Sequence, residues 1–68
     1  MNVSLNGRPV ELPPEATVAD ALAATGRAPE GRGTAVALNG EVLARTIWPR
    51  AHLEEGDRLE ILTAVQGG

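Results

Sequence analysis

Two Asn-Gly dipeptides, at residues 6–7 and 39–40, each stand between short apolar stretches. Asn-Gly fits the central positions of a type I′ turn, because both positions need a positive φ, and this turn joins antiparallel strands. Apolar and polar residues alternate along residues 2–12, which predicts a hairpin with one apolar face around the first dipeptide. Small apolar residues at 35–38 suit a central strand, and residues 41–43 form its short return. We therefore expect two tight hairpins, with the other elements packed around them.

A short helix is expected between the two hairpins. Thr17, followed three residues later by Asp20, has the sequence pattern of a capping box, so the helix should begin at Thr17. Gly26 stands where a left-handed residue would end it. The two prolines at 13–14 cannot continue a ladder, and we expect them to hold the chain extended. One side of this helix of about two turns is apolar and should pack on the sheet, through Val18, Ala21 and Leu22.

A last strand is predicted at residues 58–65, where apolar residues alternate with others after a Glu-Gly-Asp turn. Residues 45–53 show no regular period, and Trp48 and Leu53 are expected to anchor this irregular segment in the core. Trp is also enriched at binding hot spots. In a chain without other aromatic residues, we interpret Trp48 as a structural residue.

The order of these elements predicts one domain of the α+β class. A helix that crosses between two strands of one sheet is right-handed and tends to leave them parallel, which places the last strand beside the first. The expected fold is a ubiquitin-like β-grasp, with a mixed sheet of four to five strands and one packed helix. We expect residues 1–65 to form this domain and residues 66–68 to form a flexible Gly-Gly tail.

Composition excludes several classes of function. With 68 residues and no cysteine, the chain has room for one thin core and for no disulfide or thiolate metal site. The net charge is -3 and the six arginines do not cluster, so the chain repels nucleic-acid phosphates and anionic lipids. No apolar stretch approaches the ~20 residues of a membrane span. We therefore expect a cytoplasmic protein that binds neither nucleic acid nor membrane.

We expect no catalytic, metal-binding or nucleotide-binding site within the chain. Ser4 and His52 are the only serine and the only histidine, and they fall in separate segments, so a nucleophile paired with a base is missing. His52, Glu54 and Glu55 make a poor set of zinc ligands, and we interpret the two glutamates as a solvated acidic turn. No glycine motif for a nucleotide is present. The sequence predicts no catalytic residue, no metal and no bound cofactor.

The end of the sequence is the remaining candidate site, because the last predicted strand leads directly into Gln66, Gly67 and Gly68. Residues without a Cβ can extend through a narrow channel and let another protein approach the carbonyl closely. A terminal carboxylate is ionised at neutral pH and must be activated before it can acylate anything. Terminal glycines can also be an incidental tail. We favour a role in which the Gly68 carboxylate reacts.

The chain resembles the ThiS family of thiamin-biosynthesis sulfur carriers along nearly all of its length. The opening hairpin and the start of the helix look like those of the family. The more specific stretches lie further on, at residues 35–42, at Arg45 and Trp48 with the spacing R-x-x-W, at Glu-Gly-Asp 55–57 and at the terminal Gly-Gly. Relatives that serve molybdopterin synthase usually carry Pro-Pro-Val before Gly-Gly, whereas Thr-Ala-Val-Gln stands here.

This resemblance implies a mechanism and a set of partners. A ThiF-like adenylating enzyme, which binds the ATP, would adenylate the Gly68 carboxylate, and a sulfur-donating enzyme would supply the sulfur of the resulting thiocarboxylate. Gly67 and Gln66 would lie in the channel of the adenylating enzyme and later in that of a ThiG-like thiazole synthase, which takes the sulfur. The chain itself would be a carrier and not an enzyme.

Two other functions stay open: a sulfur carrier for molybdopterin synthesis or tRNA thiolation, and a β-grasp binding module in which Gly-Gly is incidental. Each of them needs a partner surface, and specific interfaces take about 800 Å² from each partner. Strand alternation places Leu62 and Ala64 on the exposed face of the sheet, next to Val65. We expect partners to dock there.

Overall fold

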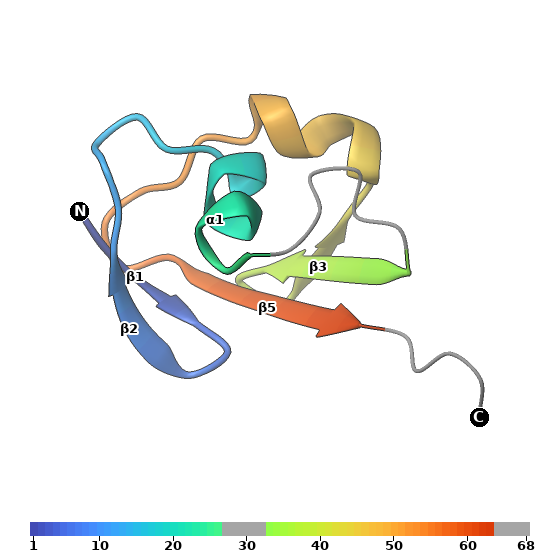
Figure 1. The fold of residues 1–68 in the computed structure, drawn as a ribbon, viewed down its shortest axis with the longest axis horizontal. Helices are drawn as coiled ribbons and strands as arrows, with labels where there is room; N and C mark the ends of the chain where they lie inside the picture. The colour runs from blue at the N-terminus through green and yellow to red at the C-terminus, as the bar shows by residue number, and fades with distance from the viewer. Residues whose placement is uncertain (27–32, 64–68) are drawn as a thin grey trace.

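The computed structural model describes residues 1–26 and 33–63 and shows a five-stranded sheet with an α-helix packed on one face (Figure 1). In chain order the elements are β1 (Asn2–Leu5), β2 (Arg8–Glu11), α1 (Val18–Ala24), β3 (Thr34–Leu38), β4 (Glu41–Leu43), the 3-10 helix η1 (Arg45–Arg50) and β5 (Arg58–Thr63). Neither helix in these ranges is long and apolar enough to cross a membrane. The predicted tail at 66–68, and the end of the predicted last strand at 64–65, lie outside the described residues.

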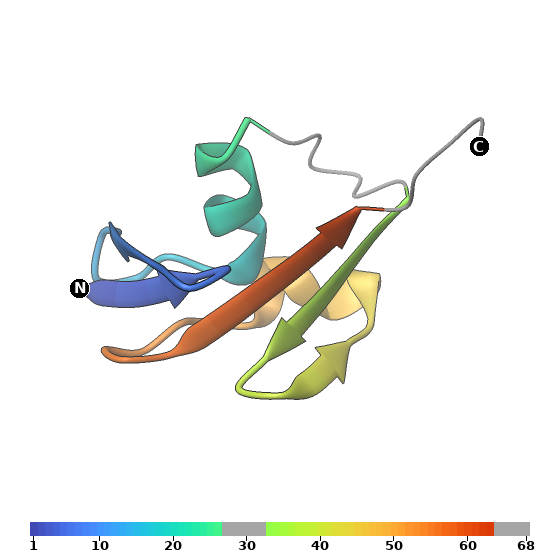
Figure 2. The ribbon, with the colours of Figure 1, turned by 90° about the horizontal axis from the view of Figure 1, so that it is seen from below.

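The strand order across the sheet is β2-β1-β5-β3-β4. β1 pairs with β5 in parallel, and the other three neighbouring pairs are antiparallel. Figure 2 shows β5 crossing the sheet between β1 and β3. The last strand therefore lies beside the first, as the right-handed crossover predicts. The predicted β-grasp with a mixed sheet and one packed helix is confirmed, with five strands.

Both Asn-Gly dipeptides form the tight turns predicted for them. Asn6 and Gly7 have φ of 52° and 83°, and Asn39 and Gly40 have φ of 51° and 86°. The first turn joins β1 to β2 and the second joins β3 to β4, and each pair of strands is antiparallel. Positive φ at both central positions is the requirement of a type I′ turn, whose twist agrees with that of the strands it joins.

The predicted capping box holds the start of α1. The Thr17 hydroxyl accepts a hydrogen bond from the Asp20 amide at 3.2 Å, and the Asp20 carboxylate accepts one from the Thr17 amide at 2.9 Å. Gly26 has a φ of 80°, the left-handed conformation expected just after the helix. The apolar side of α1 is completely buried, through Val18, Ala21 and Leu22.

One hydrophobic cluster fills the space between α1 and the sheet. Its buried members from the strands are Val3, Val36, Leu59 and Ile61. Trp48 on η1 and Leu53 after it are also buried, as predicted. The Trp48 indole N–H donates to the Leu43 carbonyl oxygen at 3.2 Å, so the one polar group of this side chain is satisfied inside the protein. The interpretation of Trp48 as a structural residue is confirmed.

Two segments differ from the sequence-based expectation. The prolines at 13–14 do not hold an extended chain, because the Ala16 amide donates to the Pro13 carbonyl oxygen at 3.1 Å across a turn. Proline fixes φ near about -65°, which suits the second position of such a turn as well as an extended strand. Residues 45–50, expected to be irregular, form η1, which packs against α1. Short 3-10 helices escape a search for the α-helical period because their side chains repeat every three residues.

Replacing Thr17 with alanine removes the hydroxyl acceptor of the capping box, and we expect a loss of about 1 kcal/mol in the free energy of unfolding. A domain of this size then melts about 4 to 8 °C lower. Thermal unfolding followed by circular dichroism measures the change. Thr46→Ala, at an exposed position of η1, is the control and should shift the melting temperature by less than half as much. Equal shifts for the two variants would contradict the capping role.

Candidate functional site at the end of the last strand

β5 leads to the predicted reacting end of the chain and is held on both sides where it begins. Every residue of β3 pairs with a residue of β5, from Leu38 opposite Leu59 to Thr34 opposite Thr63. β1 pairs with β5 only at Arg58 and Leu59. The base of the candidate site is therefore the central strand of the sheet, and the last residues of that strand are beyond the β1 ladder.

Most of the predicted site residues follow β5 in the sequence. Five of them lie outside the described residues, namely Ala64, Val65, Gln66, Gly67 and Gly68. Their roles as partner surface, channel tail and sulfur-carrying residue stay predictions. Leu62 is the predicted site residue that falls within the described part of the chain, and it is 69% exposed. The described part of the site is thus the surface around the end of β5.

Leu62 belongs to an apolar patch on the face of the sheet that is turned away from α1. Ile61 points into the core, so Leu62, the next residue along β5, points to the other face. Its cross-strand partner is Ala35 of β3. Ala37, which is also in β3, lies opposite Val42 of β4. Val42 is 74% exposed. We call this set the outer patch, and its members are Leu62, Ala35, Ala37 and Val42.

Charged residues border the outer patch along β5. Arg58 and Glu60 share the face of Leu62, because they alternate with buried residues of this strand, and both are exposed. Glu60 lies directly opposite Ala37 across the β3–β5 pair. An apolar centre with a charged border is typical of a surface that binds another protein.

Two asparagine side chains hold the backbone of β5, and sequence reasoning missed both. Asn6 Oδ1 accepts from the Ile61 amide at 2.7 Å, and Asn6 Nδ2 donates to the Ile61 carbonyl oxygen at 3.1 Å. Asn39 Oδ1 accepts from the Arg58 amide at 2.9 Å, and Asn39 Nδ2 donates to the Asp57 carboxylate at 3.1 Å. The Asn-Gly pattern predicts the turns but not these bonds, because the bonds depend on which strand lies beside each turn.

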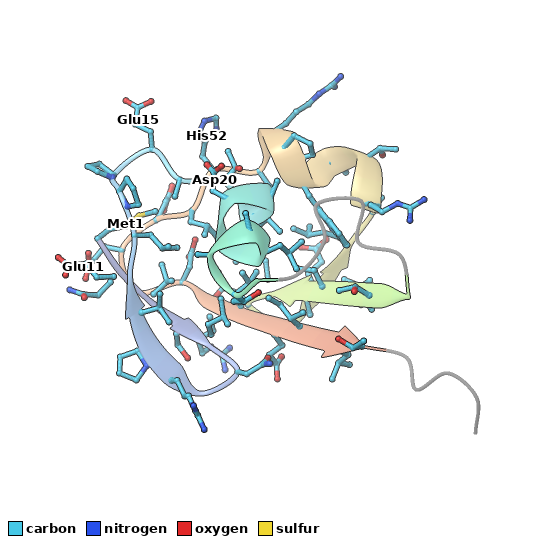
Figure 3. The ribbon with its side chains drawn as sticks, in the orientation of Figure 1. Met1, Glu11, Glu15, Asp20 and His52 are labelled. Carbon is cyan, nitrogen blue, oxygen red and sulfur yellow. The ribbon has the colours of Figure 1, made fainter. Side chains whose placement is uncertain are left out.

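Ser4 and His52, the residues weighed as a nucleophile and a base, lie on separate segments of the fold. Figure 3 shows His52 on the side of the molecule away from the end of β5. His52 forms an isolated backbone bridge with Thr17 beside the start of α1, whereas Ser4 lies in β1 opposite Arg58. In the part of the chain that the structure describes, no three side chains of the His, Cys, Asp and Glu types gather as a metal site would require.

The acidic turn at residues 54–55 has a structural role beyond the solvated charge that we expected. The Glu55 carboxylate accepts a hydrogen bond from the Asn2 amide at 2.9 Å, which joins this turn to the start of β1. The Glu54 amide donates to the Asp57 carboxylate at 2.7 Å within the turn. The turn therefore helps to bring the first strand beside the beginning of β5, and its glutamates are not equivalent.

The fold and the site define this protein as a small ubiquitin-like β-grasp domain with an exposed apolar sheet face beside its last strand. The profile of the ThiS family matches residues 3–68, and the chain belongs to this family. The family resemblance seen in the motifs is thereby confirmed over almost the whole sequence.

Solved structures agree with this assignment. The crystal structure of the thiamine biosynthesis protein ThiS from Geobacter metallireducens is 33% identical, with a TM-score of 0.81, and the match covers 100% of both chains. A solution NMR structure of a thiamine biosynthesis protein from the same organism is 34% identical with a TM-score of 0.81, covering 100% of this chain and 88% of that one. The crystal structure of SAMP1 from Haloferax volcanii is 29% identical with a TM-score of 0.60, covering 98% and 97%. No curated protein matches the chain.

The two glutamates of the acidic turn should respond differently to substitution. Glu55→Ala removes the acceptor for the Asn2 amide, so we expect faster hydrogen exchange at that amide and a loss of about 0.5 to 1 kcal/mol in the free energy of unfolding, since the bond is exposed. Amide exchange by NMR and urea unfolding measure the two effects. Glu54→Ala is the matched control and should leave exchange at Asn2 unchanged. Equal exchange in both variants would show that Glu55 carries solvated charge alone.

Proposed function

We propose that this chain is a sulfur carrier that acts in thiamin biosynthesis in the cytoplasm. The observation that carries the proposal is the ThiS family match over residues 3–68, which runs through both terminal glycines. The similar ThiS structure from Geobacter metallireducens supports it, because the match spans both chains completely. The fold supports it as well, since the central strand β5 is the element that leads into those glycines.

The Gly68 carboxylate is the group that carries the sulfur. As a free ion it is a poor acylating group, because neither oxygen is a good leaving group. A ThiF-like enzyme joins the carboxylate to AMP from ATP and releases pyrophosphate, so that AMP becomes the leaving group of a mixed anhydride. Sulfur at the oxidation level of sulfide, supplied by a sulfur-donating enzyme, then attacks the carbonyl carbon and displaces AMP. The product is a C-terminal thiocarboxylate.

The chain supplies the reacting end, and its partners supply the catalytic groups. Gln66 and Gly67 pass through the channel of the ThiF-like enzyme, where glycine lets the enzyme backbone approach the reacting carbonyl. The same tail then enters a ThiG-like thiazole synthase, which takes the sulfur in exchange for an oxygen atom from its substrate or from water and so returns the carrier with its carboxylate. Because the chain is converted and regenerated in each cycle, it is a co-substrate and not an enzyme.

The outer patch is the docking surface in this proposal, together with Ala64 and Val65, which follow it in the sequence. A specific interface takes about 800 Å² from each partner. That area is roughly a sixth of the 4623 Å² accessible surface of this chain, so the tail alone does not provide it. Leu62 is the exposed apolar residue of β5 and lies next to its end. Docking through Leu62 therefore brings the tail to the partner.

The carrier function predicts a defined change in mass. The protein is incubated with ATP, a sulfur source and the soluble extract of its host, and intact mass spectrometry follows the chain. We expect a gain equal to the replacement of one oxygen by one sulfur, because the terminal carboxylate becomes a thiocarboxylate. A form that lacks Gly68 and a form with one residue added after Gly68 should not change.

This experiment and a sulfur-transfer assay have three outcomes that separate the competing functions. No gain under conditions that convert a known carrier would exclude the carrier function and favour a β-grasp binding module. After a gain, transfer of the sulfur to purified thiazole synthase identifies the thiamin carrier. Failure of that transfer would instead favour a carrier for molybdopterin synthesis or tRNA thiolation.

The docking surface predicts a change in KM without a change in kcat. Leu62→Thr removes the exposed apolar side chain from the outer patch and keeps a residue that suits a strand. We expect the KM of the adenylating enzyme for the carrier to rise about tenfold, as the loss of about 1.4 kcal/mol of binding requires. Ile47→Thr, at another exposed apolar residue on η1, is the control. Similar KM values for the two variants would place the docking surface elsewhere.

A further inference from the structure

The side chain of Asn6 makes hydrogen bonds to β5 like those that one more residue of β1 would make. The β1–β5 ladder ends at Leu5 opposite Leu59, where the chain enters its first turn. The Asn6 amide still donates to the Leu59 carbonyl oxygen at 2.9 Å. The Asn6 side-chain carboxamide, which has an acceptor and donors as a peptide group does, then binds both the amide and the carbonyl of Ile61. Asn6 therefore carries hydrogen bonding along this edge of β5 past the end of the ladder.

Ile61, whose backbone accepts and donates these two hydrogen bonds, lies directly before the candidate site in the sequence. The Ile61 side chain is buried in the core, and the next residue, Leu62, belongs to the outer patch. Gly68 follows Ile61 by seven residues. The last segment of β5 thus connects the docking surface to the reacting end, and Asn6 holds that segment from the β1 side while β3 holds it from the other.

We infer that Asn6 is a positioning residue for the sulfur-carrier chemistry, an inference that rests on the proposed function. By holding the backbone of Ile61, Asn6 fixes the end of β5 relative to the outer patch. A strand segment bonded on one side opens more often than a segment bonded on both. In the docked carrier, each opening takes the Gly68 carboxylate out of the geometry needed for attack on ATP, and misplacement at this stage slows the reaction. Loss of Asn6 should therefore lower kcat more than it raises KM.

Asn39 provides a comparison, because it occupies the corresponding turn position at the other end of β5. It is also the first residue of an Asn-Gly turn with positive φ, and its side chain also makes two hydrogen bonds, to the Arg58 amide and to Asp57. It holds the beginning of β5, away from the reacting end. A purely structural function of these asparagines predicts similar effects for both, whereas positioning predicts an effect on the reaction for Asn6 alone.

The test compares Asn6→Gly with Asn39→Gly in the full chain. Glycine adopts positive φ without strain, so both turns stay compatible with their hairpins while the side-chain bonds are lost. For Asn6→Gly we expect hydrogen exchange at the Ile61 amide to become about tenfold faster, kcat of adenylation by the ThiF-like enzyme to fall about fivefold, and KM to stay within about twofold. For Asn39→Gly we expect faster exchange at Arg58, with kcat and KM within about twofold of the wild type. Thermal unfolding of both variants corrects for any loss of folded protein.

A conservative variant completes the test. Asn6→Asp keeps an acceptor for the Ile61 amide and tolerates positive φ, but it has no donor for the Ile61 carbonyl. Its kcat should lie between those of the wild type and Asn6→Gly. Equal kcat values for Asn6→Gly and Asn39→Gly, or a kcat of Asn6→Gly unchanged despite faster exchange at Ile61, would overturn the inference. A wild-type chain that no ThiF-like enzyme adenylates would overturn the proposed function, and the positioning inference with it, even if exchange at Ile61 responds as expected.

Discussion

The parallel pairing of β1 with β5 is the interaction on which the rest of the structure depends. It joins strands from opposite ends of the sequence and, through β5, links the β1–β2 hairpin to the β3–β4 hairpin in one sheet. A two-stranded hairpin is marginal in water by itself, so the β1–β2 hairpin depends on this link, whereas β3 and β4 also pair with β5 directly through β3. The Glu55 carboxylate and the Asp57 carbonyl oxygen reinforce it by accepting from the amides of Asn2 and Ser4. The core under α1 forms because this pairing joins the strands into one sheet.

The two Asn-Gly turns show how one residue type meets a local and a global requirement together. Locally, Asn6 and Asn39 supply the positive φ of a tight turn. Globally, their side chains bind the backbone of β5 at Ile61 and Arg58. A chain without cysteine has no disulfide to hold its central strand, and here polar side chains from two turns contribute instead. Agreement between local preference and final fold is the mark of a sequence that specifies one structure.

The sequence predicted the elements whose causes are local. The two turns, the capping box at Thr17 and the end of the helix at Gly26 each depend on residues within one turn of each other. The place of the last strand beside the first is not a local property, and it was predicted from the handedness of the crossover. The turn after Pro13 and the 3-10 helix around Trp48 were not predicted, because proline suits more than one conformation and because the second helix forms by packing on α1.

In the candidate site, too, the features with local causes could be predicted from the sequence. Exposure of Leu62 follows from strand alternation, but the grouping of Ala35, Ala37 and Val42 with it required the order and register of the strands. The bond from Asn6 to Ile61 joins residues 55 positions apart, so no local pattern could reveal it. The role predicted for the terminal glycines came from their context, namely the expected fold, the small size and the lack of another candidate site, and the resemblance to the ThiS family added to it, because Gly-Gly alone is a weak signal.

Burial of Trp48 gives the protein a built-in optical probe. Trp48 is the only aromatic residue in the chain, it is 2% exposed, and its N–H is bonded to the Leu43 carbonyl oxygen. All near-ultraviolet absorption and intrinsic fluorescence of the free protein therefore arise from one indole in one fixed environment on the β4–η1 side of the core. Unfolding brings that indole into water and changes its emission. The proposed replacement of an oxygen by sulfur at Gly68 adds no aromatic group, so folding can be followed by Trp48 fluorescence in the same sample in which the proposed terminal chemistry is followed by mass.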